Sequence, residues 1–228
     1  MKSALIIGAS RGIGLGLAAE HIARGWHVTA TARGLAPELE ALSRSSDGRL
    51  AVERADITRP ADIEALSNRL AGRSFDLLFL NAGIMVGRGI PIVDLADADV
   101  VAIFMTNAIS PIRVADRLLG LTAPGATVAF MSSVLGSVSK NDDGRAELYR
   151  ASKAALNSLV LSFRARHGDR TDLTVLALHP GVVRTSMGGP SAPLDIETSV
   201  KGLADTLGKR TGTGGVAFVD YRDEIIPW

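Results

Sequence analysis

Short apolar runs rich in β-branched residues alternate along the chain with longer amphipathic stretches. Because strands separated by helices form βαβ units, this alternation predicts a parallel sheet with helices on both faces. We expect seven strands, over Ala4–Ile7, His27–Thr31, Leu50–Glu53, Phe75–Leu80, Thr127–Met131, Leu173–Leu178 and Val216–Val219. We expect six helices, over Ile13–Arg24, Ala36–Ser43, Ala61–Ala71, Asp97–Leu119, Glu147–His167 and Ile196–Leu207. The predicted fold class is therefore α/β, a doubly wound sheet of about seven parallel strands in a single domain over residues 1–228.

Composition places the chain among globular proteins and disfavours several other classes. Lys+Arg 25 against Asp+Glu 24 gives a net charge of +1, so a nucleic-acid partner has no electrostatic basis. There is no cysteine, hence no disulfide or thiolate site, and we expect a cytoplasmic protein. The apolar run Val100–Met105 is far shorter than the ~20 residues of a membrane span, so no membrane contact is expected. The scattered histidines lack metal-ligand spacing and predict no metal site.

A glycine-rich turn directly follows the first predicted strand and opens the first predicted helix. Its residues Gly8-Ala9-Ser10-Arg11-Gly12-Ile13-Gly14 have the spacing G-x-x-x-G-x-G, a variant of the dinucleotide fingerprint. Glycines let the backbone approach a phosphate, and the N–H groups of the first helical turn point at it. The turn therefore predicts a dinucleotide site on a Rossmann-like fold, with tight strand–helix packing as the alternative. The same residues match the G-x-S-x-G elbow of hydrolases, but too little chain precedes Gly8 for the strands that such an elbow needs.

The end of the second predicted strand indicates which dinucleotide binds. An acid there hydrogen-bonds the ribose 2′-hydroxyl of NAD, whereas a base accommodates the 2′-phosphate of NADP. The segment 29–34 has no acid and contains Arg33, whose forked guanidinium suits a phosphate. Arg11 in the glycine-rich turn offers a second clamp. We therefore predict NADP(H), with two solvated surface arginines as the alternative.

A tyrosine and a lysine lie near the start of the long predicted helix Glu147–His167. Tyr149 and Lys153 are four positions apart, so both side chains project from one face of that helix. A free phenol has a pKa of about 10, and a nearby ammonium favours the phenolate, so the pair is a tunable proton donor and acceptor. The hydroxyl of Ser133 could steady charge developing on a substrate oxygen. Taken alone, the Tyr-x-x-x-Lys spacing also fits an amphipathic surface helix.

Together these motifs resemble the short-chain dehydrogenase/reductase family over essentially the whole chain. The matching residues are Gly8, Gly12 and Gly14, Asp56, Asn81-Ala82-Gly83, Asn107, Ser132-Ser133, Tyr149 with Lys153, and Pro180-Gly181-Val182-Val183-Arg184-Thr185. The ending 226–228 and the stretch 141–149 are similar to the C-factor-like subgroup, which is related to carbonyl reductases. The resemblance implies NADP(H)-dependent reduction of an aldehyde or ketone to an alcohol, or the reverse.

The resemblance also implies a role for each of four catalytic residues. Tyr149 would be the general acid/base that protonates the carbonyl oxygen, and Lys153 would lower the pKa of Tyr149 and bind the nicotinamide ribose. Ser133 would hold the substrate oxygen. Asn107 would bend its helix and hold a water molecule of a proton relay.

For cofactor binding, the resemblance implies that Asp56 contacts the adenine and that Thr185 meets the nicotinamide carboxamide. The complete set of expected cofactor-binding residues is Gly8, Ser10, Arg11, Gly12, Ile13, Gly14, Arg33, Asp56, Ile57, Asn81, Ala82, Gly83, Tyr149, Lys153, Pro180, Gly181, Val182, Val183 and Thr185. The expected partners are a small carbonyl or alcohol substrate and further copies of this chain. A homodimer or homotetramer would form through the long helices 97–119 and 147–167.

Some features depart from the family pattern or leave alternatives open. The polar insert Lys140–Gly144 lengthens the spacing between Ser133 and Tyr149, and we expect it to form part of the pocket wall. Met85 and Met187 are expected to flank the pocket, whereas Trp228 packs either on a partner subunit or on its own sheet. The rival hypothesis is a non-enzymatic NADP(H)-binding sensor on the same fold, which would have no need of the four catalytic residues.

Overall fold

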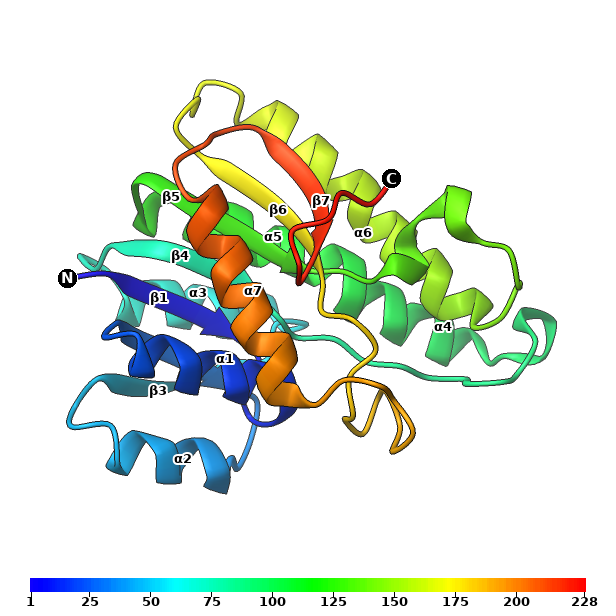
Figure 1. Ribbon diagram of the computed structural model, residues 1–228, viewed down its shortest axis with the longest axis horizontal. Helices are drawn as coiled ribbons and strands as arrows, with labels where there is room; N and C mark the ends of the chain where they lie inside the picture. The colour runs from blue at the N-terminus through cyan, green and yellow to red at the C-terminus, as the bar shows by residue number, and fades with distance from the viewer.

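Seven parallel strands form the centre of the computed structural model, which describes residues 1–228 (Figure 1). Their order across the sheet is β3-β2-β1-β4-β5-β6-β7. The strands are β1 (Ser3–Ile7), β2 (His27–Ala32), β3 (Leu50–Arg54), β4 (Phe75–Leu80), β5 (Thr122–Met131), β6 (Thr174–His179) and β7 (Val216–Asp220). The strand order reverses between β1 and β4, which is where open α/β sheets bind their ligands. The predicted seven-stranded parallel sheet is confirmed.

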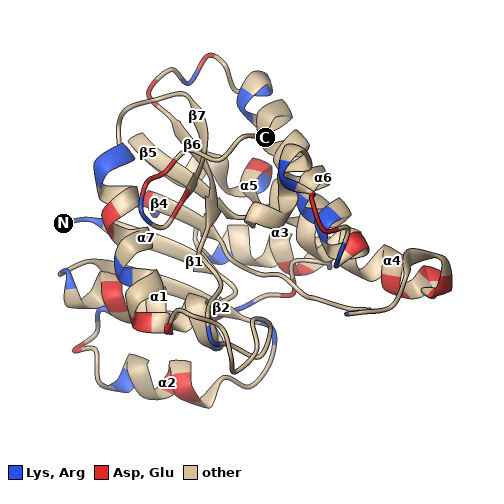
Figure 2. Ribbon diagram, turned by 45° about the vertical axis from the view of Figure 1, so that its right-hand side comes forward, with Lys and Arg blue, Asp and Glu red and all other residues tan.

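The helices cover both faces of this sheet. They are α1 (Gly12–Ala23), α2 (Pro37–Arg44), α3 (Pro60–Arg69), α4 (Asp97–Phe104), α5 (Ser110–Leu118), α6 (Glu147–Arg166) and α7 (Ile196–Arg210). Buried side chains of α1, α2 and α7 pack in one core with one face of the sheet, and those of α3, α5 and α6 pack in a second core with the other. Charges of both signs are spread over the outer helices and loops (Figure 2).

The two cores explain why the strands are almost continuously apolar. In β1, Leu5 and Ile7 belong to the core under α3, α5 and α6, whereas Ala4 and Ile6 belong to the core under α1 and α7. Successive side chains of a strand point to opposite faces, so a sheet covered on both faces requires apolar residues at every position. Burying one such aliphatic side chain stabilises the fold by about 1.5–3 kcal/mol.

The helix predicted over 97–119 is not a single α-helix. A π-helical segment, Met105–Ile109, separates α4 from α5, and a 3₁₀ turn, Leu119–Leu121, follows. Pro111 has no backbone N–H for the regular hydrogen-bond ladder, which favours an irregular turn just before α5. By length and hydropathy alone the whole stretch Asp97–Leu121 would suffice to cross a bilayer, and half of its apolar window is buried in the fold. Packing of α5 on the sheet accounts for the buried part of this stretch.

One strand of the sheet begins earlier than predicted, and the C-terminus packs in one of the two expected ways. Strand β5 begins at Thr122, five residues earlier than expected, because Phe75 of β4 pairs with Thr122 before the register shifts to Leu77 and Thr127. At the C-terminus, the ring of Trp228 lies 5.5 Å from that of Phe218 in β7. Trp228 therefore packs on its own sheet, which decides between the two alternatives.

Candidate active site

A cavity of about 1010 Å³ lies at the carboxyl ends of the strands. This volume is at the upper end of the range for ligand pockets and suits a large, extended ligand. Of the predicted site residues, only Gly14 and Asn107 do not line it. The predicted residues that do are Gly8, Ser10, Arg11, Gly12, Ile13, Arg33, Asp56, Ile57, Asn81, Ala82, Gly83, Ser133, Tyr149, Lys153, Pro180, Gly181, Val182, Val183 and Thr185.

The glycine-rich turn forms one end of the cavity and has no room for side chains. Gly8 has φ of +89°, and a Cβ there would lie 2.8 Å from backbone atoms of Ala82. A Cβ on Gly14 would lie 2.2 Å from the Gly8 carbonyl oxygen, so Gly14 permits close packing of α1 behind the turn. The Asn81 amide donates to that same carbonyl at 2.6 Å, and the Thr31 hydroxyl accepts from the Gly8 N–H at 3.0 Å. This bare, rigid backbone fits a pyrophosphate.

Positive charge gathers beside this end of the cavity. Arg11 and Arg33 both line it, and neither forms an ion pair within the protein. The Asp56 carboxylate accepts hydrogen bonds from the Thr58 N–H at 2.9 Å and the Thr58 hydroxyl at 2.7 Å. Burial raises the pKa of Asp56, but these hydrogen bonds and the charge of Arg33 outweigh it and hold the pKa below its usual range. Two unpaired guanidinium groups in a cavity fit a phosphate group.

The other end of the cavity holds a buried phenol and a buried amine from the first turns of α6. Tyr149 and Lys153 are only 8% and 3% exposed, and the Lys153 nitrogen lies 5.8 Å from the centre of the Tyr149 ring. The Lys153 ammonium donates to the carbonyl of Met131 at 2.8 Å, at the end of β5. Two residues later, Ser133 caps a short turn, with its hydroxyl accepting from the Leu135 N–H at 3.2 Å. The segment at the carboxyl end of β5 and the first turns of α6 thus bring Ser133, Tyr149 and Lys153 to the same cavity.

Burial dominates the ionisation of this pair. It raises the pKa of Tyr149 to about 12, against the opposing effect of the Ser133 hydroxyl, and lowers the pKa of Lys153 to about 8. Taking a charged group out of water disfavours its ionised form, which is the phenolate for tyrosine and the ammonium for lysine. The expected lowering of the Tyr149 pKa by Lys153 is therefore not seen in this structure. A phenol that stays protonated near neutral pH is a proton donor.

Asn107 lies behind the cavity wall, within the π-helical segment. Its side-chain oxygen accepts from the Ile84 N–H at 2.8 Å, and its amide donates to the Ile84 carbonyl at 2.9 Å and the Ser152 hydroxyl at 3.1 Å. The predicted bend is present as the π turn. Both amide hydrogens are used within the protein, so this side chain fixes the loop after β4, and the relay water stays a prediction.

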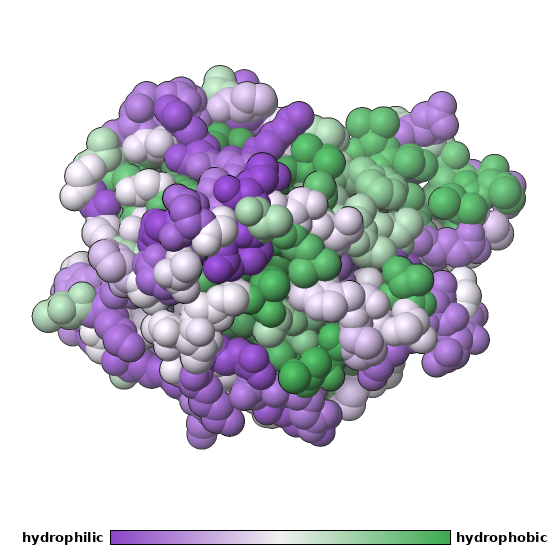
Figure 3. All heavy atoms as spheres, turned by 90° about the horizontal axis from the view of Figure 1, so that it is seen from above, coloured by the Kyte–Doolittle hydropathy of each residue, from purple (hydrophilic) through white to green (hydrophobic).

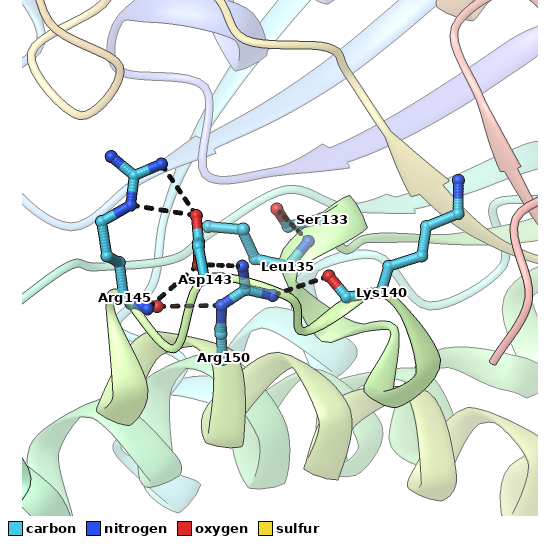
Figure 4. Close-up of polar contacts among 6 residues, drawn as sticks. All are labelled: Ser133, Leu135, Lys140, Asp143, Arg145 and Arg150. Atoms are coloured by element: carbon cyan, nitrogen blue, oxygen red, sulfur yellow. Dashed lines mark hydrogen bonds and ion pairs between the residues drawn. The ribbon is translucent and has the colours of Figure 1, made fainter.

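The insert Lys140–Gly144 does not line the cavity, contrary to expectation. Figure 4 shows Asp143 turned toward the start of α6, where it forms an ion pair with Arg150 at 2.8 Å. Asp143 also accepts from the N–H and the guanidinium of Arg145, and Arg150 donates to the Arg145 carbonyl at 2.8 Å. The Arg150 side chain is 8% exposed, so its charge draws the insert onto the helix end.

The sequence interpretation missed some residues of the cavity. Met85 and Met187 line it as expected, but Leu135, His179 and Arg88 line it as well. Burial lowers the pKa of His179 to about 4, which leaves the ring neutral at physiological pH. The available signal for Arg88 was its place between two glycines shortly after Asn81-Ala82-Gly83.

Comparisons with known proteins agree with this geometry. A family model described as short chain dehydrogenase matches residues 2–193. The C-signal protein of Myxococcus xanthus is 36% identical over 168 residues, which are 73% of this chain and 100% of that protein. A Burkholderia multivorans protein crystallised with bound NADP has a TM-score of 0.95 and 43% identity, covering 100% of this chain and 99% of its own. A carbonyl reductase from Pseudomonas aeruginosa PAO1 in complex with NADP has a TM-score of 0.91 and 38% identity, covering 100% of both chains.

These relatives bear out the resemblance found in the motifs, including its link to the C-factor and to carbonyl reductases. The match extends through the glycine-rich turn, the Tyr149 helix and most of the sheet. The chain belongs to the short-chain dehydrogenase/reductase family of oxidoreductases.

Proposed function

We propose that this chain is an NADP(H)-dependent carbonyl reductase, which reduces an aldehyde or ketone to an alcohol or catalyses the reverse. The observation that carries the proposal is the convergence of Ser133, Tyr149 and Lys153 on a cavity whose other end holds a bare glycine turn and two unpaired arginines. The NADP bound to the Burkholderia and Pseudomonas proteins, and the carbonyl-reductase name of the latter, support it.

The residues of the cavity divide between the parts of NADP(H). Arg11 and Arg33 would hold the 2′-phosphate, the glycine-rich turn the pyrophosphate, and Asp56 the adenine. Lys153 and Thr185 would hold the nicotinamide end, with Asn81 to Gly83 and Pro180 to Val183 forming the walls between. When bound, the nicotinamide supplies or accepts the hydride.

Side chains of the protein would stabilise the negative charge that develops on the substrate oxygen and supply its proton. The hydroxyl of Ser133 would donate a hydrogen bond to the substrate oxygen as negative charge develops on it. The phenol of Tyr149, which burial keeps protonated, would give its proton to that oxygen and become a phenolate. The Lys153 ammonium beside it would then stabilise the phenolate, because opposite charges attract strongly in a buried site. Asn107 would position the loop at Ile84 and, through Ser152, the first turn of α6.

The rival hypothesis of a non-enzymatic sensor is disfavoured. A sensor must bind NADP(H), but it gains nothing from a buried phenol beside an amine, each of which costs desolvation energy. Membership of an oxidoreductase family points the same way.

We further propose that copies of this chain associate through the end of the molecule that carries α4. Ile90, Ile92, Val93 and Val101 are large apolar side chains exposed on α4 and the loop before it. Figure 3 shows hydrophobic atoms gathered at the right-hand end, where Figure 1 places these segments. An exposed apolar patch is typical of a protein interface. Light scattering coupled to gel filtration should give a dimer or tetramer, and a monomer would contradict this proposal.

A panel of aldehydes, ketones and quinones tests the enzymatic proposal. Oxidation of NADPH is followed by loss of the absorbance of reduced nicotinamide, with each substrate in turn. We expect turnover with at least one class and appearance of the matching alcohol or hydroquinone. NADPH binding without turnover across the whole panel, in either direction, would contradict the proposal.

A further inference from the structure

Three arginines line the cavity, and the proposed function uses only two of them. Arg11 and Arg33 are assigned to the 2′-phosphate, which leaves Arg88 on the loop after β4 without a role. We propose that Arg88 forms an anion subsite that selects carbonyl substrates carrying a carboxylate. This inference rests on the proposed function and adds the substrate class to it.

Arg88 lies at the end of the cavity where the reaction is proposed to occur. Two nitrogens of its guanidinium contact the Met85 sulfur at 3.2 Å, and the same group donates to the backbone carbonyl of Met187. Met85 and Met187 both pack against the apolar cluster that contains Tyr149. The guanidinium thus joins the loop after β4 to the loop before α7, at two residues that pack with the Tyr149 cluster and not with the glycine-rich turn.

The charge of Arg88 has no acidic partner. Its contacts are a thioether and a carbonyl, which are neutral, and it forms no ion pair with any carboxylate of the protein. The acids that line the cavity are Glu38 and Asp56, and the charge of Arg33 acts on Asp56 at the opposite end. An anionic substrate group would therefore meet an uncompensated, forked cation that suits a carboxylate, and no acid beside it.

Arg88 follows a tight turn of the backbone at Gly87. The preceding residue, Gly87, has φ of +63°, and a Cβ there would lie 2.3 Å from a methyl carbon of Leu95. A side chain at position 87 would disfavour this conformation and collide with Leu95. Position 87 therefore requires glycine, and the turn that it makes leads into Arg88, which lines the cavity.

The residues around the reacting end indicate the rest of the substrate. Met85, Leu135 and Met187 line the cavity there and pack with Tyr149 in one apolar cluster. Such walls bind an apolar or aromatic body. The expected substrate is therefore an apolar or aromatic molecule that carries an aldehyde or ketone at one end and a carboxylate at the other.

Matched acid and ester substrates test the subsite. We would compare 4-formylbenzoate with its methyl ester, and 3-(4-formylphenyl)propanoate with its methyl ester, at saturating NADPH. In the wild type, kcat/KM should favour the acid over its ester by about tenfold in at least one pair, the effect of one charge-assisted hydrogen bond. Arg88→Gln should bring that ratio close to one, and Arg88→Lys should restore part of it.

The control is Arg44→Gln, which removes the same charge from an exposed position on α2 that does not line the cavity. It should leave the acid-to-ester ratio unchanged. A wild-type ratio of one or less in both pairs, or a ratio that Arg88→Gln does not lower, would overturn the subsite.

A binding measurement separates this inference from the proposed function. Calorimetric titration of the NADP⁺-loaded protein with each acid should give a Kd that Arg88→Gln weakens about tenfold and Arg44→Gln does not. Arg88-dependent binding of the acids, with no reduction of these four compounds or of any member of the carbonyl panel, would support the subsite and contradict the proposed function. Reduction of acids and esters at equal rates would support the proposed function and overturn the subsite.

Discussion

The side chain of Asn107 is bonded to both backbone polar groups of Ile84. It accepts from the Ile84 N–H at 2.8 Å and donates to the Ile84 carbonyl at 2.9 Å, which fastens the π-helical segment to the loop after β4. That loop begins with Asn81, whose amide holds the carbonyl of Gly8 in the glycine-rich turn. One buried asparagine thus connects the helix that packs on α6 with the cavity wall.

Replacing Asn107 with alanine should loosen this connection. Asn107→Ala removes both hydrogen bonds to the half-buried backbone of Ile84, so the free energy of unfolding should fall by about 1–2 kcal/mol. The KM for NADPH should rise as well, because the loop lines the cofactor cavity. Urea unfolding and steady-state kinetics measure both effects. Asn141→Ala, at an exposed position of the insert, is the control, and equal stability of the two variants would contradict this account.

The burial of Lys153 should appear in the pH dependence of stability. Its pKa is lowered to about 8 in the folded protein, whereas the unfolded value is 10.5. Between these values the unfolded chain binds more protons, so this residue makes stability rise with pH. The unfolding free energy of the wild type minus that of Lys153→Met should therefore increase by about 2 kcal/mol from pH 7 to pH 10.

The measurement is urea unfolding of both cofactor-free proteins at several pH values. Titrations shared by the two proteins cancel in the difference. The loss of the hydrogen bond to Met131 adds an offset that does not change with pH, so the rise with pH reports the titration of Lys153. Lys201→Met, at an exposed position on α7, should show no such increase. A difference that stays flat for Lys153→Met would mean that this lysine is hydrated in the folded protein.

Arg33 should determine the choice between NADPH and NADH. Removing its guanidinium takes away a charge-assisted contact to the 2′-phosphate, so Arg33→Ala should lower kcat/KM for NADPH by about 10- to 100-fold. NADH lacks this phosphate, and its kcat/KM should change little. Arg44→Ala serves as the control on the same side of the sheet. Equal losses with NADPH and NADH would show that Arg33 does not recognise the phosphate.

The ion pair between Asp143 and Arg150 should position the phenol of Tyr149, the residue that precedes Arg150. Asp143→Asn weakens the contacts that hold the insert on the first turn of α6, so kcat should fall about tenfold through misplacement of Tyr149. The KM for NADPH should stay unchanged, since the insert does not line the cavity. Asp142→Asn removes the same charge one residue away and should leave kcat unchanged. Matching effects of the two variants would argue against positioning.

Much of the fold followed from local patterns. The strand prediction for Phe75–Leu80 matches β4, because a strand buried on both faces has an unmistakable run of apolar residues. A bend at Asn107 was expected only from the family resemblance, and local patterns did not predict the π segment Met105–Ile109, since its residues are compatible with a regular helix. Pro111 was the signal present, but a proline near a helix start is also an ordinary feature.

The site was predictable in its residue types and less so in its energetics. The spacing of Tyr149 and Lys153 placed both on one face, yet their pKa values depend on burial by parts of the chain far away in sequence. The insert was expected to line the pocket, but Asp143 forms an ion pair with Arg150 and holds the insert on α6. This pairing could not be predicted from the sequence pattern. Arg88 was missed for the same reason, since its neighbour Met187 lies on another loop.

The most direct test of the proposed chemistry is removal of one oxygen atom. Tyr149→Phe keeps the ring in the apolar cluster and deletes the phenolic proton donor. With a carbonyl substrate that the wild type reduces, the variant should lose about 10²- to 10⁴-fold in kcat. NADPH fluorescence should report unchanged cofactor binding. Full reduction of the carbonyl by Tyr149→Phe would contradict the assignment of Tyr149 as the proton donor.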